Sequence, residues 1–188
     1  MADAPLAEHR QVHGLRVRIL NTRPDIDTDL AVRRIAAALD LVAAHAPRNY
    51  RRLHADVAAL VVERFPCRGA FFPDSRECLV ELTFTVNPRH TLAEIASSIV
   101  HEATHARVAR RCGPPPVRMR PREERICRRA ELEFGLALPA GADADVVVQR
   151  ARASLALSDP EVAPRIDWSV GARLIAEVDA RSEGDGRT

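Results

Sequence analysis

The sequence lacks lysine, C-x-x-C pairs, and any apolar run that approaches the roughly 20 residues of a membrane span. Neither a membrane protein nor a membrane partner is therefore expected. The first ten residues, MADAPLAEHR, contain no apolar signal segment, so the expected location is the cytoplasm. Aromatic residues make up only 4% of the chain, and leucine, valine, isoleucine and alanine must therefore fill the core.

The net charge of the chain is also small. All 28 basic residues are arginine, yet the net charge is only +2 and both signs are interspersed along the sequence. A polyanionic partner is not required by this pattern. The Arg-rich residues 118–129 are the only support for nucleic-acid binding, and Glu123 and Glu124 interrupt them, which is typical of a solvated surface. Nothing in the sequence determines the oligomeric state.

Four cysteines, Cys67, Cys78, Cys112 and Cys127, form no spacing typical of a disulfide framework or a structural zinc site. We expect reduced thiols that pack as small apolar groups. Cys67 and Cys78 flank a predicted hairpin and are the one pair that could form a disulfide.

The length of 188 residues favours a single domain. We predict a flexible tail at 1–10, one domain at 11–181 and a disordered polar tail at 182–188. Apolar spacing and breakers predict a strand at 12–20, a hairpin at 67–86, and helices at 28–45, 48–64, 91–112, 122–138, 143–157 and 168–181. A surface loop is predicted at 113–121, where prolines prevent a helix. This order predicts an α+β fold, mostly helical, with a small antiparallel or mixed sheet.

One predicted helix carries the chemistry. Thr91 and Glu94 form a capping-box pattern at its start, and residues 101–105 read His-Glu-Ala-Thr-His. At 3.6 residues per turn, His101 and His105 lie about 40° apart in projection and about 6 Å apart along the axis, so both imidazoles can bind one ion. Glu102 lies beside them and can reach a water in an open metal position. Zinc would lower the pKa of that water to about 7, and the carboxylate would accept its proton.

The environment of this motif argues against a surface helix with two incidental histidines. Apolar side chains make the helix suited to a buried position, and small side chains leave room around the histidines. The apolar group is Ile95, Ile99, Val100 and Val108, and the small group is Ala103, Thr104 and Ala106.

Residues 98–106 resemble the active-site helix of the zincin metallopeptidases, with a departure at Arg107, where an apolar residue is usual. The chain has no histidine after His105, which excludes the metzincin branch and leaves a gluzincin-like pattern. This resemblance implies a third metal ligand, a glutamate on the next helix. The resemblance to the zincins extends more loosely from the hairpin to Pro139, and residues 123–139 also resemble a group of uncharacterised bacterial predicted metallopeptidases.

Three glutamates compete for the role of third ligand. Glu124 has the spacing from His105 that the resemblance implies, and we predict that it binds the metal with His101 and His105. Glu131 is the alternative, either as the ligand or as a partner of a histidine N–H, and Glu123 is the third candidate.

Two functions remain open at this stage. The first is a zinc-dependent hydrolase, expected to be a peptidase, with Glu102 as general base and a peptide or protein as substrate. The second is a catalytically idle zincin scaffold that binds a partner. For the hydrolase, the resemblance implies that a hairpin strand, 77–86 or 70–72, pairs with the substrate. Candidates to stabilise the oxyanion are Tyr50, His54, His90 and Arg128.

Overall fold

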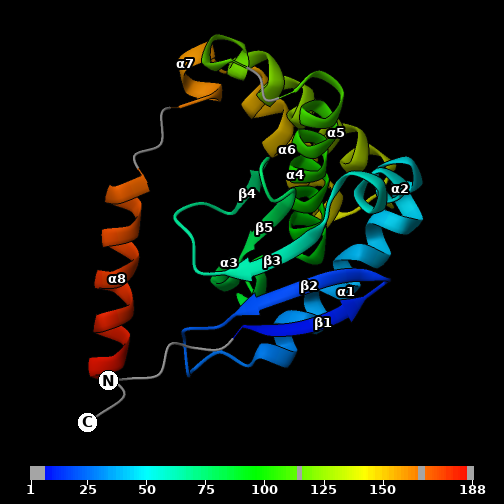
Figure 1. Cartoon of the computed structure of the whole chain (residues 1–188). Coiled ribbons are helices and arrows are strands. Elements are labelled where there is room, and N and C mark those ends of the chain that lie inside the picture. Colours follow the sequence, from blue (N-terminus) through cyan, green and yellow to red (C-terminus); the bar gives the residue numbers. More distant parts are fainter. Residues whose placement is uncertain (1–6, 114–115, 165–167, 186–188) are drawn as a thin grey trace.

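One mixed sheet lies against a group of helices in the computed structural model, which describes residues 7–113, 116–164 and 168–185 (Figure 1). The strand order is β1-β2-β3-β5-β4, in which β2, β3 and β5 are parallel and the edge strands β1 and β4 are antiparallel to their neighbours. The strands are β1 (Glu8–Val12), β2 (Leu15–Leu20), β3 (Ala59–Glu63), β4 (Gly69–Phe72) and β5 (Glu77–Glu81).

The helices surround a central one, α4, which contacts α1, α2, α5, α6 and the strands β4 and β5. The helices of the described residues are α1 (Thr28–His45), α2 (Pro47–Asp56), α3 (Leu82–Val86), α4 (Leu92–Cys112), α5 (Arg120–Ala137), α6 (Ala142–Leu155), α7 (Asp159–Val162) and α8 (Trp168–Asp185), and a 3-10 turn spans Val117–Met119. The fold is α+β and mostly helical with one small sheet, which confirms the predicted fold class. No helix of the described residues has the length and apolar character that crossing a membrane requires.

Local sequence accounts for the two best-predicted helices. The Asp27 side chain accepts a hydrogen bond from the backbone N–H of Asp29 and begins α1. Thr91 and Glu94 form both hydrogen bonds of the capping box at the start of α4. Gly113 ends α4 with a φ of 72°, a conformation that glycine adopts without strain.

The helix predicted at 48–64 is wrong in its second half. The chain is helical only to Asp56, and Ala59–Glu63 forms the central parallel strand β3. Leu60, Val61 and Val62 are each at most 1% exposed. A strand buried on both faces has a continuous apolar run rather than alternation, and periodicity cannot distinguish such a run from a buried helix.

The strand predicted to continue to Val86 is also wrong, because the chain turns into the short helix α3 at Leu82. The Glu81 side chain accepts a hydrogen bond from the backbone N–H of Phe84, and Thr85 donates its hydroxyl to the carbonyl of Glu81. These side-chain bonds cap a helix at the point where β-branched residues alone favour a strand.

Other differences lie at the ends of elements. The predicted strand at 12–20 is a hairpin whose first strand, β1, begins at Glu8, so Glu8–Arg10 belong to the sheet rather than to a tail. His13 and Gly14, both with positive φ, form its two-residue turn. Helix α5 begins at Arg120 with Pro121 in its first turn, where a missing N–H is tolerated. Helix α8 continues to Asp185, α7 was not predicted, and residues 114–115 and 186–188 lie outside the described residues.

All four cysteines are free, so the disulfide considered for Cys67 and Cys78 is not formed. Cys78 is buried in β5, and the Cys67 thiol donates to the carbonyl of Gly69 at 2.8 Å.

Candidate metal centre

Helix α4 holds the three motif residues where it passes under the edge of the sheet. Its first half is buried on every side, because α1, α2, α5 and α6 pack around it. His101 and Glu102 are each 6% exposed, and His105 is partly buried one turn later. The packing that buries this helix therefore also holds the imidazoles in place.

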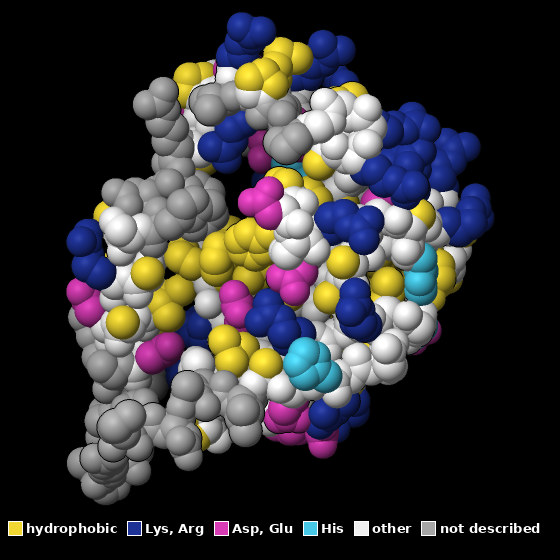
Figure 2. All heavy atoms as spheres, in the orientation of Figure 1, with side chains coloured by type: hydrophobic (Ala, Val, Ile, Leu, Met, Phe, Trp, Pro, Cys, Tyr) yellow, Lys and Arg dark blue, Asp and Glu magenta, His cyan; other side chains and the backbone are white. Residues whose placement is uncertain are grey.

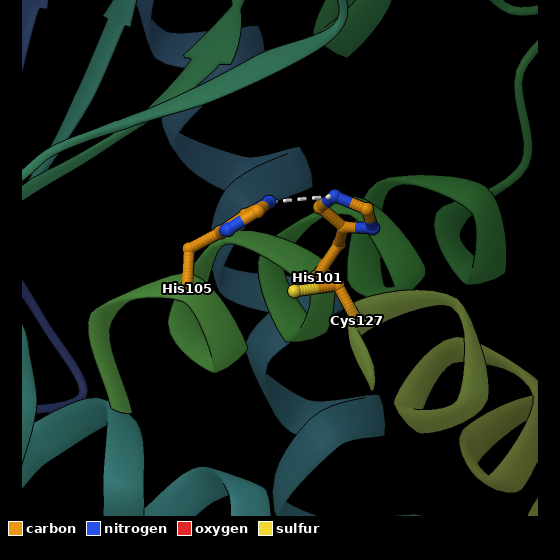
Figure 3. Close-up of side chains that lie close together, drawn as sticks. All are labelled: His101, His105 and Cys127. Carbon is orange, nitrogen blue, oxygen red and sulfur yellow. Dashed lines mark hydrogen bonds between the residues drawn. The ribbon is translucent and has the colours of Figure 1, made fainter. Parts of the chain in front are cut away.

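The two imidazoles point toward one another. Their Nε2 atoms lie 3.1 Å apart, as Figure 3 shows by the dashed line between the rings. From α5, Glu124 places one carboxylate oxygen 3.3 Å from Nε2 of His101 and the other 3.5 Å from Nε2 of His105. Of the three glutamates considered from the sequence, Glu124 is the one whose carboxylate reaches both Nε2 atoms.

These separations fit a tetrahedral zinc site. With Zn–N and Zn–O bonds of about 2.0–2.1 Å, two ligands at the tetrahedral angle are about 3.3 Å apart. The Nε2–Nε2 separation is 3.1 Å, and each Nε2 has one of the two Glu124 oxygens at 3.3 or 3.5 Å, all close to that value. Bound this way, the ion would keep one position open for water.

The outer nitrogens of both rings face carboxylates. Nδ1 of His101 lies in hydrogen-bonding contact with Glu131, and Nδ1 of His105 lies 2.8 Å from Oε1 of Glu123. A carboxylate accepts but does not donate, so each Nδ1 carries a proton, and in a metal-bound centre each neutral ring would direct its Nε2 lone pair at the ion. Two lone pairs and the Glu124 carboxylate would repel one another without a cation between them. The donor set therefore fits a metal ion.

The charges around the histidines also favour a cation at this site. Burial alone would lower the pKa of His101, but neighbouring Cys127 and the carboxylates of Glu124 and Glu131 outweigh it and raise the pKa to about 10. The pKa of Glu124 falls well below its usual range, because its hydrogen bonds to both histidines overcome the opposing effect of burial. In the absence of a metal ion, protons would take the place of the positive charge that these carboxylates favour.

Cys127 is a second possible partner of the histidines. Its Sγ and one nitrogen of each histidine lie within 4.8 Å of one another. The thiol, however, is fully buried and lies outside the cleft lining, whereas Glu124, His101 and His105 all line the cleft. In Figure 3 the sulfur lies below the rings, whereas the Nε2 atoms meet above it. Glu124 therefore reaches the histidines from the cleft side, and Cys127 reaches them from the buried side.

Glu102 lies against the edge strand β4. A Cβ atom added to Gly69, the first residue of β4, would lie 2.7 Å from Oε1 of Glu102 and 2.9 Å from the hydroxyl of Ser98. Only glycine therefore allows the strand to approach this carboxylate so closely. Burial raises the pKa of Glu102 above its usual range, and the charges of His101 and His105 oppose this rise. The sequence does not predict the contacts of Gly69 and Ser98 with Glu102, because its only signal is a glycine at the start of a short extended run.

A cleft of about 620 Å³ opens onto these groups, with Glu102, His101, His105 and Glu124 in its lining. Figure 2 shows the surface hollowed on this face, where basic, acidic and histidine side chains lie side by side.

The four oxyanion candidates fall in different places. Tyr50 and His54 pack on each other beside His13, and His90 packs on Phe84. Of the four, Arg128 lines the cleft, where it donates to Glu131 at 2.7 Å.

Comparison with protein-family models, with curated proteins and with solved structures finds no match to this chain. The functional argument therefore rests on the motif and on the geometry described above.

Proposed function

We propose that this protein is a zinc-dependent hydrolase that cleaves peptide bonds. One observation carries the proposal: Nε2 of His101, Nε2 of His105 and the Glu124 carboxylate lie 3.1–3.5 Å from one another, with both Nδ1 atoms on carboxylates. This arrangement suits zinc, which favours two imidazoles, one carboxylate and an open position. His101, His105 and Glu124 would hold the ion.

Zinc, when bound, supplies a water of lowered pKa and polarises the carbonyl of the substrate. Glu102 lines the same cleft and is not needed as a ligand, so its carboxylate is free to accept the water's proton and to pass it to the leaving amine. Its burial raises its proton affinity toward that of the activated water. Of the four oxyanion candidates, Arg128 is the one that lines the cleft.

The edge strand supports a peptide substrate. Strand β4 pairs with β5 on one side and ends the sheet on the other, so its second edge can pair with an extended chain. Gly69 of this strand lies against Glu102, which brings the edge next to the base. A peptide bound along β4 would thus present its backbone beside the metal centre. The sequence analysis considered this strand as the substrate edge, and the hairpin's other strand, β5, lies inside the sheet.

A catalytically idle scaffold accounts less well for the cleft. Such a protein needs the metal ligands but gains nothing from a buried carboxylate beside the open position, and burial of an unpaired charge is unfavourable. Glu102 is 6% exposed and lines the cleft. The burial of Glu102 in the cleft therefore favours the hydrolase over the idle scaffold.

The test combines metal analysis with peptide cleavage. Protein purified without chelator should contain about one zinc per chain, and it should cleave members of a mixed peptide library read by mass spectrometry. Glu102→Gln should keep the zinc and lose cleavage by several orders of magnitude, because the amide preserves shape but cannot accept the proton. Glu133→Gln, an exposed change on α5, is the matched control. Cleavage by Glu102→Gln at the wild-type rate would refute the role of Glu102.

A further inference from the structure

Four arginines line the cleft that contains Glu102: Arg120 at the start of α5, and three from separate parts of the chain. Arg68 precedes β4, Arg128 lies on α5 and Arg150 lies on α6. The Arg68 guanidinium lies over the ring of Phe84, 5.1 Å from its centre. Residues far apart in the sequence therefore bring positive charge to one wall.

Arg68, Arg128 and Arg150 share two carboxylates. Arg150 donates to Glu94 at 3.2 Å, and Arg68 lies 3.6 Å from the same oxygen. Arg128 donates to Glu131 at 2.7 Å, and Arg150 lies 4.0 Å from that residue's other oxygen. Three positive charges thus face two negative ones.

Both carboxylates are already engaged elsewhere. Glu131 also contacts His101 and accepts from Ser97, and Glu94 accepts from the backbone N–H of Thr91 at the start of α4. Four arginines and the two charges of the proposed zinc give six positive charges at the cleft. Five carboxylates oppose them, those of Glu94, Glu102, Glu123, Glu124 and Glu131, which leaves a surplus of one positive charge.

Two of the arginines also have unused donors. The Nε atoms of Arg128 and Arg150 are buried and have no hydrogen-bond partner among the described residues. A buried N–H without an acceptor is unfavourable, and native proteins contain few of them. Burial lowers the pKa of Arg150, and the nearby charges of Arg68 and Arg128 lower it further, against the effect of Glu131 and Glu94. A ligand with negative charge at the terminal nitrogens would offset the repulsion among these arginines.

We propose that Arg128 and Arg150, with Arg68 at the rim, bind a carboxylate of the substrate next to the peptide bond that is cleaved. This inference rests on the proposed peptidase function and names its substrate class, an acidic peptide. A guanidinium pairs with a carboxylate through two parallel N–H···O bonds, which its terminal N–H groups can provide. The carboxylate belongs either to an Asp or Glu side chain or to the free C-terminus of the peptide.

A purely structural role of the arginines makes a different prediction. If they only hold Glu94 and Glu131 in place, their loss should affect all peptides alike. If they bind the substrate, the loss should be confined to peptides that carry the carboxylate.

The experiment measures binding of labelled peptides to zinc-loaded Glu102→Gln protein by fluorescence anisotropy. Four peptides of one backbone sequence combine Glu or Gln at one position with a free or an amidated C-terminus. Losing one charged pair is expected to change affinity by about 10-fold or more. Arg150→Gln and Arg128→Gln, each placed on the Glu102→Gln background, should weaken the acidic peptides by that factor and the neutral peptide by less than about twofold. Arg152→Gln and Arg129→Gln, exposed neighbours on the same helices, should change neither.

The four peptides identify the source of the carboxylate, since only one of the two replacements, Gln or the amide, should abolish the preference. Equal binding of acidic and neutral peptides by the protein with both arginines would overturn the proposal without any variant that could misfold. An equal loss for all peptides in Arg150→Gln would also overturn it. Selective binding of acidic peptides together with no cleavage by wild-type protein would refute the hydrolase but leave the carboxylate site standing.

Discussion

The two histidines of the centre are held by unequal partners. On the His101 side, Glu131 is 1% exposed and is also bonded to Ser97 and Arg128. On the His105 side, the Glu123 side chain is 12% exposed and its described contact is with His105 alone. Electrostatic interactions strengthen as water is excluded, so the same carboxylate–imidazole pair is worth more at the buried side. We therefore expect Glu131 to stabilise metal binding through His101 more than Glu123 does through His105.

Glu124 belongs to neither side, because its carboxylate reaches both Nε2 atoms. Glu124→Ala should therefore have the largest effect on the metal. Zinc affinity, measured by competition with a chromogenic chelator, should fall well beyond the roughly 10–100-fold that follows loss of an outer partner. Glu133→Ala on the exposed face of the same helix is the control. A smaller loss than in Glu131→Ala would mean that the ligand has been misassigned.

Gly69→Ala separates the base from the metal. The new Cβ would lie 2.7 Å from Oε1 of Glu102, so the carboxylate must move, and a displacement of about 1 Å can reduce the rate by about 100-fold. Peptide cleavage should fall by that order while zinc content stays at the wild-type level. The comparison is with Ala70→Gly in the same strand. Loss of zinc together with activity would place Gly69 in support of the whole centre instead.

Glu131→Gln tests the buried carboxylate that contacts Nδ1 of His101. Zinc affinity should fall by about 10–100-fold, because the amide supports Nδ1–H of His101 less well than a carboxylate. Stability should also fall by about 2 kcal/mol, because Arg128 loses its charged partner in a poorly solvated place. Urea unfolding of the metal-free protein measures the change in stability separately from the change in zinc affinity. Unchanged stability would show that Arg128 finds another acceptor.

Glu123→Gln tests the more exposed carboxylate, which contacts Nδ1 of His105, and should have the smallest effect. Zinc affinity should fall by about 10-fold or less, at the lower end for an outer partner, and urea unfolding should be unchanged within about 0.5 kcal/mol. The same titration as for Glu131→Gln gives the comparison directly. A loss equal to or larger than that of Glu131→Gln would contradict the ranking by burial.

Local sequence predicted the parts of the molecule that local chemistry determines. Helix α4 was predicted from its capping box and apolar spacing, and the motif on it follows from helix geometry. Strand β3 was missed because its apolar run is compatible with two structures, and only pairing with β2 and β5 decides between them.

Local sequence also does not determine which glutamate lies beside which histidine nitrogen. Glu123, Glu124 and Glu131 were all candidates for one role, and the packing of α5 on α4 places them at three different atoms of the two rings. That assignment depends on contacts between helices, which periodicity within one helix does not contain. Arg150 had no signal at all, because it reaches the cleft from α6, far along the chain.

X-ray absorption at the zinc edge of the zinc-loaded wild-type protein tests the central claim most directly. Zinc bound by His101, His105 and Glu124 predicts a first shell of nitrogen and oxygen only, at about 2.0–2.1 Å. Glu124→Ala should change this shell, and Cys127→Ala should leave it as in wild type. A sulfur atom at about 2.3 Å that disappears in Cys127→Ala would contradict the account and assign the third ligand to the buried thiol.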